Sequence, residues 1–306
     1  MTGLKTILAA MAIAGIFSTS LGEAQRAEKM HSRASSTCCA TEASKQWMPS
    51  HANRLALVIG NSSYPDADAP LAQTVNDSSA LANALRKDGF DIYLVQNATR
   101  DDMTHAIARL KTKIRPNSIV MVYFGGFGIQ SDGQSYMLPV DAKIWYEDDV
   151  RRDGISIDRL LSELKNSGAH IRLAVIDASR RNPYERRFRS YSHGLAPIEA
   201  GKNALILTSM PPSEVVDDSR GSHSVLITAL LDEMNSSTDS VEKIFDDTRL
   251  AVTRKTQNQQ IPAVSSSPID DVKLGPAPTN AVVSSGRSFR SSNMTNLEFA
   301  QPTRIL

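Results

Sequence analysis

Short, nearly continuous apolar runs alternate along this chain with segments of helical period, and this alternation constrains the fold more than any other feature. The runs read RLALVIG, FDIYLV, SIVMVYF, IRLAVID and ALILTSM. Strands without polar alternation are typical of a parallel sheet that is buried on both faces. The sequence therefore predicts an α/β sandwich, with a largely parallel central sheet of about six strands and helices on both faces.

The expected elements follow from these patterns. We expect strands at 54–60, 90–95, 118–124, 171–177 and 204–210, an edge strand within 263–274, and a short ribbon at 136–140. Helices are expected at 75–87, 157–165, 224–234 and 241–253, and a further helix should open on the capping box Thr99-x-x-Asp102 and turn Met103, Ala106, Ile107 and Leu110 inward. Ligands of such sheets bind beyond the carboxyl ends of the strands. Those ends are Gly60-Asn61, Gly125–Gly128, Asp177–Arg180 and Ser209–Ser213.

The two ends of the chain do not share this pattern. Lys5, the apolar run Ile7–Phe17 and the small residues near Ala24 have the three-part form of a secretory signal, and the run is too short to span a bilayer. An uncleaved amphipathic or anchor segment is the alternative. We predict a signal peptide at 1–24, a flexible segment at 25–52, one folded domain at 53–275 and a disordered tail at 276–306. The protein is expected to be exported, either periplasmic or secreted.

Charge and cysteine content exclude several partners and one kind of chemistry. The formal net charge is +1, and no basic stripe accompanies stacking aromatics, so neither nucleic acid nor a membrane surface is an expected partner. Cys38 and Cys39 are adjacent, which leaves an intermolecular disulfide or a free thiol pair open. Residues 40–306 contain no cysteine. A cysteine nucleophile within the predicted domain is therefore excluded.

Two of the strand ends carry the informative motifs. The turn Gly125-Gly126-Phe127-Gly128 lacks both the G-x-G-x-x-G spacing and a G-K-[ST] sequence, so we expect neither a nucleotide nor any other cofactor or metal there. The fourth strand ends in VIDASRRNP, where Ser179 lacks the G-x-S-x-G setting of a serine nucleophile. Taken alone, Ser179 is better explained as a hydroxyl that caps its loop.

Together these two motifs match the spacing of a cysteine-peptidase dyad. The caspase cysteine motif lies about 50 residues after the catalytic histidine, and Ser179 follows Phe127 by 52 positions. Over roughly residues 53–273 the chain resembles the caspase-like domain of caspases, metacaspases and bacterial orthocaspases. The resemblance rests on RLALVIGNSSY, VNDSSALANALRKDGFDI, YFGGFGIQSDGQSYMLPVDA, VIDASRRNP, GLAPIEA and ALILTSMPPSEVVDD, in that order.

The resemblance implies a caspase-hemoglobinase-like sandwich whose catalytic dyad is degenerate. Active bacterial members read Y-x-G-H-G and D-A-C-R-x-N-P, so Phe127 stands at the histidine position and Ser179 at the cysteine position. The amide of Gly128 corresponds to the oxyanion side. A hydroxyl needs a base more than a thiol does, and a phenyl ring offers none. We therefore predict a protein without peptidase activity, in a family of cysteine endopeptidases specific for Arg or Lys.

One alternative is a weak serine-based hydrolase in which another histidine serves Ser179. The chain has six histidines, and His193 and His223 lie in loops expected near the strand ends. A purely structural alternative treats Cys38-Cys39 and the tails as tethers in a cell-envelope scaffold. The natural partner and the oligomeric state are not encoded in any motif.

The resemblance also implies that an acidic pocket survives. In the metacaspase and orthocaspase branch, a pocket that selects Arg or Lys uses two aspartates, which correspond here to Asp77 and Asp177. Two close carboxylates can share a guanidinium. A basic peptide or protein segment is thus the expected partner, and Arg186 or Arg187 of the chain's own loop is a candidate occupant. The alternative is structural: Asp77 favours a helix N-terminus and Asp177 holds the Arg180 loop.

Overall fold

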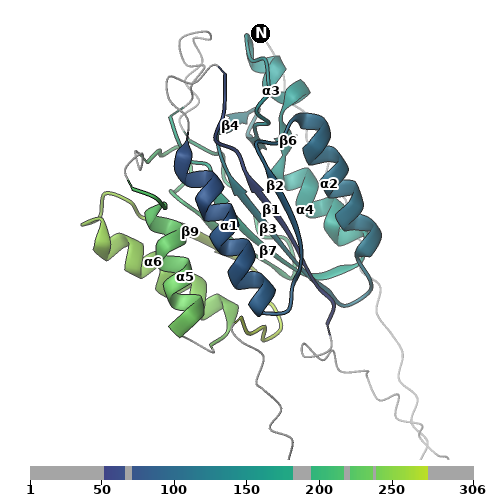
Figure 1. Cartoon of the computed structure of the whole chain (residues 1–306), viewed down its shortest axis with the longest axis vertical. Coiled ribbons are helices and arrows are strands. Elements are labelled where there is room, and N and C mark those ends of the chain that lie inside the picture. The colour runs from purple at the N-terminus through teal and green to yellow at the C-terminus, as the bar shows by residue number, and fades with distance from the viewer. Residues whose placement is uncertain (1–51, 66–70, 182–193, 217–220, 237–238, 275–306) are drawn as a thin grey trace, which may run out of the picture. The chain divides into compact units, whose positions relative to one another are not determined.

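The computed structural model describes residues 52–65, 71–181, 194–216, 221–236 and 239–274 (Figure 1). The predicted signal peptide, the two predicted tails and Cys38-Cys39 lie outside these ranges, except for the last residue of the N-terminal segment. The predicted domain of 53–275 is described apart from its final residue and internal gaps. No helix of the described ranges is both long enough and apolar enough to cross a bilayer.

The core of the fold is a six-stranded sheet in the order β2-β1-β3-β7-β8-β9. Its strands are β1 (Arg54–Gly60), β2 (Asp91–Gln96), β3 (Ser118–Gly125), β7 (Ala169–Asp177), β8 (Ala204–Thr208) and β9 (Ala263–Ser266). The first five pair in parallel, and β9 joins the β8 edge antiparallel. The predicted sandwich with a largely parallel sheet is confirmed, and each predicted strand of this sheet is present with small shifts at its ends.

Helices cover both faces of the sheet (Figure 1). One face carries α1 (Ala72–Lys87), α5 (Val225–Ser236) and α6 (Val241–Lys255), and the other carries α2 (Arg100–Lys113) and α4 (Ile157–Asn166). The strands supply alternate residues to two separate apolar clusters, one under each helical layer. In α2 the predicted capping box is formed and the four predicted inward residues are buried.

A second, smaller sheet lies beyond the end of β3. It consists of β4 (Gly128–Ser131), β5 (Gln134–Met137) and β6 (Ile155–Ser156), in that order, with α3 (Glu147–Asp153) in the connection before β6. The predicted ribbon at 136–140 overlaps β5 only at Tyr136 and Met137, because the hairpin turns earlier, at Asp132-Gly133. Both turn residues have positive φ, 50° and 71°, and Asp-Gly is the sequence that favours such a turn. The small sheet thus follows directly on the glycine turn of the candidate site.

The start of α1 also differs from the expectation. The helix begins at Ala72, three residues before the predicted start at Val75. The Thr74 hydroxyl donates to the carbonyl oxygens of Asn61, at 2.7 Å, and Leu71, at 2.8 Å. These contacts attach the first turn of α1 to the carboxyl end of β1. Asp77, which belongs to this part of the helix, is thereby placed beside the strand ends.

Candidate functional site

Three neighbouring strands end at the same level and create the site. Gly60 of β1 pairs with Gly125 of β3, and Gly125 pairs with Asp177 of β7. The chain then continues these pairings beyond the sheet, since the amide of Gly126 donates to the Asp177 carbonyl at 3.3 Å and that of Gly128 to the Ala178 carbonyl at 3.1 Å. The structure therefore brings the Phe127 turn and the Ser179 loop side by side, as the dyad spacing predicted.

Phe127 is a buried residue of the apolar cluster beneath the small sheet. The residue is 7% exposed, and its ring packs edge-on against Tyr64, with the ring centroids 4.9 Å apart. The Tyr64 hydroxyl accepts the Phe127 amide at 3.1 Å and donates to the Leu138 carbonyl at 2.9 Å. A Cβ at Gly126 would lie 2.5 Å from this hydroxyl. The glycine of the turn is thus required by the close approach of Tyr64.

Ser179 lies at the end of β7 with its side chain fully buried. Within the described ranges its hydroxyl has no hydrogen-bond partner. Its amide donates to the Ser209 hydroxyl at 3.3 Å, and its carbonyl accepts the amide of Val216 at 2.8 Å. The loop is therefore held through its backbone, while the Ser179 hydroxyl has no described group to activate it.

The two backbone amides that would face a developing oxyanion both have internal acceptors. The Gly128 amide is directed to the Ala178 carbonyl and the Ser179 amide to the Ser209 hydroxyl. An oxyanion hole needs donors that point at the reacting oxygen. In this arrangement the donors point into the protein instead.

Asp177 forms an ion pair with the arginine three residues further along the chain. Its Oδ2 lies 3.2 Å from Nη2 of Arg180, and both side chains are at most 4% exposed. Nη1 of Arg180 donates to the Gly126 carbonyl at 3.1 Å and also to the carbonyl of Asp177 itself. The guanidinium therefore links the two strand ends that carry Phe127 and Ser179.

Asp77 is fully buried and holds the segment that leads into α5. Its carboxylate accepts the amide of Ser224 at 3.1 Å and lies 2.7 Å from Nδ1 of His223. Burial, followed by the negative charge of Asp177, raises the pKa of Asp77 to about 6, although the contacts with Ser224 and His223 lower it. The charge of Asp177 thus acts on Asp77, and each of the two aspartates has a partner from the chain itself.

One of the other predicted participants contacts a different residue. His223 was a candidate base for Ser179, but its Nδ1 faces Asp77. His193, Arg186 and Arg187 lie outside the described residues. The roles of Tyr64 and Ser209 were not anticipated, and the only signal in the sequence was their position just after strand ends.

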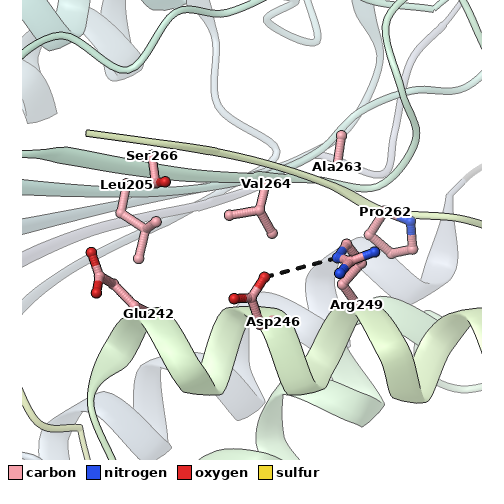
Figure 2. A pocket seen from close by; sticks show the side chains of 8 residues that line it. All are labelled: Leu205, Glu242, Asp246, Arg249, Pro262, Ala263, Val264 and Ser266. Carbon is pink, nitrogen blue, oxygen red and sulfur yellow. Dashed lines mark ion pairs between the residues drawn. The ribbon is translucent and has the colours of Figure 1, made fainter. Parts of the chain in front are cut away.

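A separate hollow of about 540 Å³ lies between α6 and the β8–β9 edge (Figure 2). It is lined by Leu205, Glu242, Asp246, Arg249, Pro262, Ala263, Val264 and Ser266. Asp246 and Arg249 are 3.9 Å apart, and their side chains are 59% and 38% exposed. The strand-end residues described above do not line this hollow.

In the described ranges, no group of three or more His, Cys, Asp or Glu side chains could hold a metal ion.

Comparisons with known proteins agree with this architecture. The mouse (Mus musculus) mucosa-associated lymphoid tissue lymphoma translocation protein 1 homolog is 27% identical over 137 residues, which are 44% of this chain and 16% of that protein. The human (Homo sapiens) protein is 26% identical over 137 residues, with the same coverage. The chain thus spans about a sixth of the length of these curated relatives.

A solved structure and a family profile extend the comparison to most of the chain. The crystal structure of protein GSU0716 from Geobacter sulfurreducens superposes with a TM-score of 0.51 and 14% identity, covering 71% of this chain and 94% of that one, and it supports the fold alone. The caspase domain profile matches residues 53–273. The chain therefore belongs to the caspase domain family.

Proposed function

We propose that this protein is a non-catalytic member of the caspase domain family that binds Arg- or Lys-containing segments of other proteins at the Asp77–Asp177 site. The observation that carries the proposal is the buried Arg180 guanidinium, which is held by the Asp177 carboxylate and the Gly126 carbonyl. A site that accommodates a basic side chain of its own chain has the charge and the acceptors to hold one from a partner. We also propose export, on the signal-like N-terminal segment.

The absence of catalysis is proposed on chemical grounds. Phe127 provides no proton acceptor, and the Ser179 hydroxyl has no base among the described residues. In comparable hydrolases, loss of the nucleophile or the base lowers turnover by on the order of 10⁶, about 8 kcal/mol of barrier. The internal acceptors of the Gly128 and Ser179 amides add to this barrier, because both donors would have to turn before they could stabilise an oxyanion.

Retention of the two aspartates supports the binding role. Both side chains are fully buried, and a buried carboxylate is unfavourable unless a cation or several donors compensate it. The contacts of Asp177 with Arg180 and of Asp77 with Ser224 also fit the structural alternative, in which the aspartates only hold loops. The two roles differ in one consequence: only a binding site discriminates among external ligands.

Turnover is tested with fluorogenic peptides that end in Arg or Lys. We expect release of the fluorophore at the rate of the buffer control, with no difference between the wild type and Ser179→Ala. Turnover that disappears in Ser179→Ala would instead establish the serine hydrolase.

Binding is tested with the same peptides in uncleavable form, by fluorescence anisotropy. We expect saturable binding that Asp177→Asn abolishes and Asp88→Asn leaves within twofold. Asp88 is the matched control, because it is also a buried acid but caps the opposite end of α1 from Asp77. Equal loss of peptide binding in both variants, or no binding to the wild type, would refute the ligand site and favour the structural scaffold.

A further inference from the structure

Another hollow, of about 430 Å³, lies between α2, α4 and the small sheet, on the face of the central sheet that α2 and α4 cover (Figure 1). Its floor includes Ile107, Tyr136 and Leu160, which are each at most 8% exposed. The volume falls in the range of ligand sites, roughly 300–1,000 Å³. None of the strand-end residues lines this hollow, so it is separate from the Asp77–Asp177 site.

The rim of the hollow is basic. Three helices contribute one arginine each: Arg100 from α2, Arg151 from α3 and Arg159 from α4. The acid among the lining residues is Glu163, which accepts Nζ of Lys111 at 3.0 Å and Nε of Arg159 at 2.9 Å. Hydrogen bonds from these two side chains lower the pKa of Glu163. Its charge is thus already compensated, and the rim carries an excess of positive charge.

Two of the three arginines have weak compensation of their own. Nε of Arg100 donates to the carbonyl of Arg152 at 3.1 Å, and no carboxylate of the described residues lies within ion-pair distance of this guanidinium. Arg151 donates to the Ser131 hydroxyl at 2.9 Å and pairs with Asp148, whose side chain is 83% exposed. Ion pairs that are so exposed contribute little. Both guanidinium groups are therefore available to an external anion.

Two helices also begin at this hollow. Arg100 is the first residue of α2, and Ser156, which lines the hollow, is the N-cap of α4. The N-terminus of a helix carries a positive partial charge. Asp101, Asp102 and Asp158 in the first turns offset part of this charge, but none of them lines the hollow. The helix ends therefore add to the attraction for an anion.

The floor limits the kind of anion. It is largely apolar, and its polar atom is the Tyr136 hydroxyl, which donates to Oε1 of Gln134 at 3.3 Å. A phosphate or sulfate ion would leave the apolar side chains of Ile107 and Leu160 uncovered. A nucleic acid would need exposed aromatic faces for stacking, whereas Tyr136 is 7% exposed. A ligand that fills the hollow thus combines an apolar group for the floor with anionic groups for the rim.

We propose that this hollow binds an acidic segment of a partner protein, with a large apolar side chain on the floor and flanking carboxylates on Arg100, Arg151 and Arg159. Guanidinium groups suit this task, because their planar fork matches a carboxylate through two parallel hydrogen bonds. The proposal uses no residue of the Asp77–Asp177 site and is independent of the proposed function. It adds a second interaction surface of opposite charge preference.

The test is isothermal titration of the full chain with three hexapeptides, each acetylated and amidated. The first is Glu-Glu-Leu-Phe-Glu-Glu, the second has glutamine in place of each glutamate, and the third has Ser-Ser in place of Leu-Phe. We expect saturable binding of the first peptide at low ionic strength and about tenfold or weaker binding of the other two. Added salt should weaken the first peptide, because it screens exposed charges.

Charge reversal at the rim locates the binding. Arg100→Glu and Arg159→Glu should each weaken the first peptide by about tenfold. Glutamate is favourable in the first turn of a helix, so Arg100→Glu should fold, which circular dichroism verifies. Arg249→Glu is the matched control, because Arg249 is also an exposed helical arginine but lines the hollow at α6, and its effect should stay within about twofold.

Three results would overturn the proposal. The first is no binding of the acidic peptide to the wild type. The second is equal binding of the Ser-Ser peptide, which would show general attraction by charge without use of the floor. The third is an equal effect of Arg249→Glu and the two rim variants, which would place the binding outside this hollow.

Discussion

Arg180 and Asp177 form a buried ion pair 3.2 Å long, three residues apart, at the strand end where a caspase-like enzyme would carry its cysteine. The same guanidinium reaches the Gly126 carbonyl, next to Phe127. The contact therefore connects, through a cation, the strand ends that carry Phe127 and Ser179, the two positions proposed as a degenerate dyad. Under the proposed function, the strand ends keep a charge-recognition role and lack the catalytic groups.

Asp177→Asn should destabilise the protein by about 3–5 kcal/mol, because it leaves the Arg180 guanidinium buried without its counterion. Equilibrium unfolding in urea measures the change. The double variant Asp177→Asn with Arg180→Gln should recover part of this loss, since no charge then remains unpaired. Additive losses in the double variant would show that the two side chains do not interact as the distance indicates.

Asp77 should make stability fall as the pH rises from about 4 to about 6. Its pKa in the folded protein is about 6, against roughly 3.9 in an unfolded chain. Between these values the folded state holds a proton that the unfolded state has lost, so this contribution decreases through the window and is constant above it. The groups that face Asp77 are His223, Ser224 and the charge of Asp177.

Asp77→Asn removes this titration. The stability of the variant relative to the wild type should therefore rise with pH across the window, by on the order of 3 kcal/mol at most. Chemical unfolding at half-unit steps from pH 4 to 7 measures the difference. A difference that stays flat over this range would contradict the raised pKa.

Tyr64→Phe should cost about 1–3 kcal/mol, because the lost hydroxyl serves two buried backbone groups, the amide of Phe127 and the carbonyl of Leu138. Tyr146→Phe is the matched control: that side chain is 73% exposed, and its change should stay within about 0.5 kcal/mol. Thermal unfolding of both variants measures the difference between the two stability changes. Similar small effects would mean that Tyr64 does not hold the glycine turn.

Restoring the dyad with Phe127→His and Ser179→Cys should not restore cleavage of arginine peptides. The Gly128 and Ser179 amides would still face the Ala178 carbonyl and the Ser209 hydroxyl, so the oxyanion would lack its donors. Burst-phase assays with fluorogenic substrates measure this. Cleavage well above background would show that the amides reorient readily and that the site is still arranged for catalysis.

The sheet and its helices could be predicted from the sequence because burial on both faces leaves long apolar runs. The α2 helix was predicted to its cap because Thr99 and Asp102 satisfy each other locally. Of the small sheet, only part of β5 was predicted, as a short ribbon, because the three strands are two to four residues long, too short for a periodic signal. Its clearest local signal is the turn Asp132-Gly133.

The position of the site could be predicted from the sequence, but the contacts between its side chains could not. The order of the motifs placed Phe127 and Ser179 at neighbouring strand ends, which the register of β3 and β7 confirms. The contact of Asp77 with His223 joins residues 146 positions apart, so no local pattern encodes it. The sequence also offered several loop arginines beside Asp177. Tertiary packing, through the carbonyl of Gly126, distinguishes Arg180 among those described.

The Asp77–Asp177 site is proposed to bind arginine without cutting the chain that carries it. Isothermal titration of the wild type with two peptides that differ only in arginine or citrulline tests it most directly, because citrulline keeps the shape and removes the charge. We expect saturable binding of the arginine peptide, no detectable binding of the citrulline peptide, and an intact peptide recovered afterwards. Equal binding of the two peptides, or recovery of a cleaved product, would contradict it.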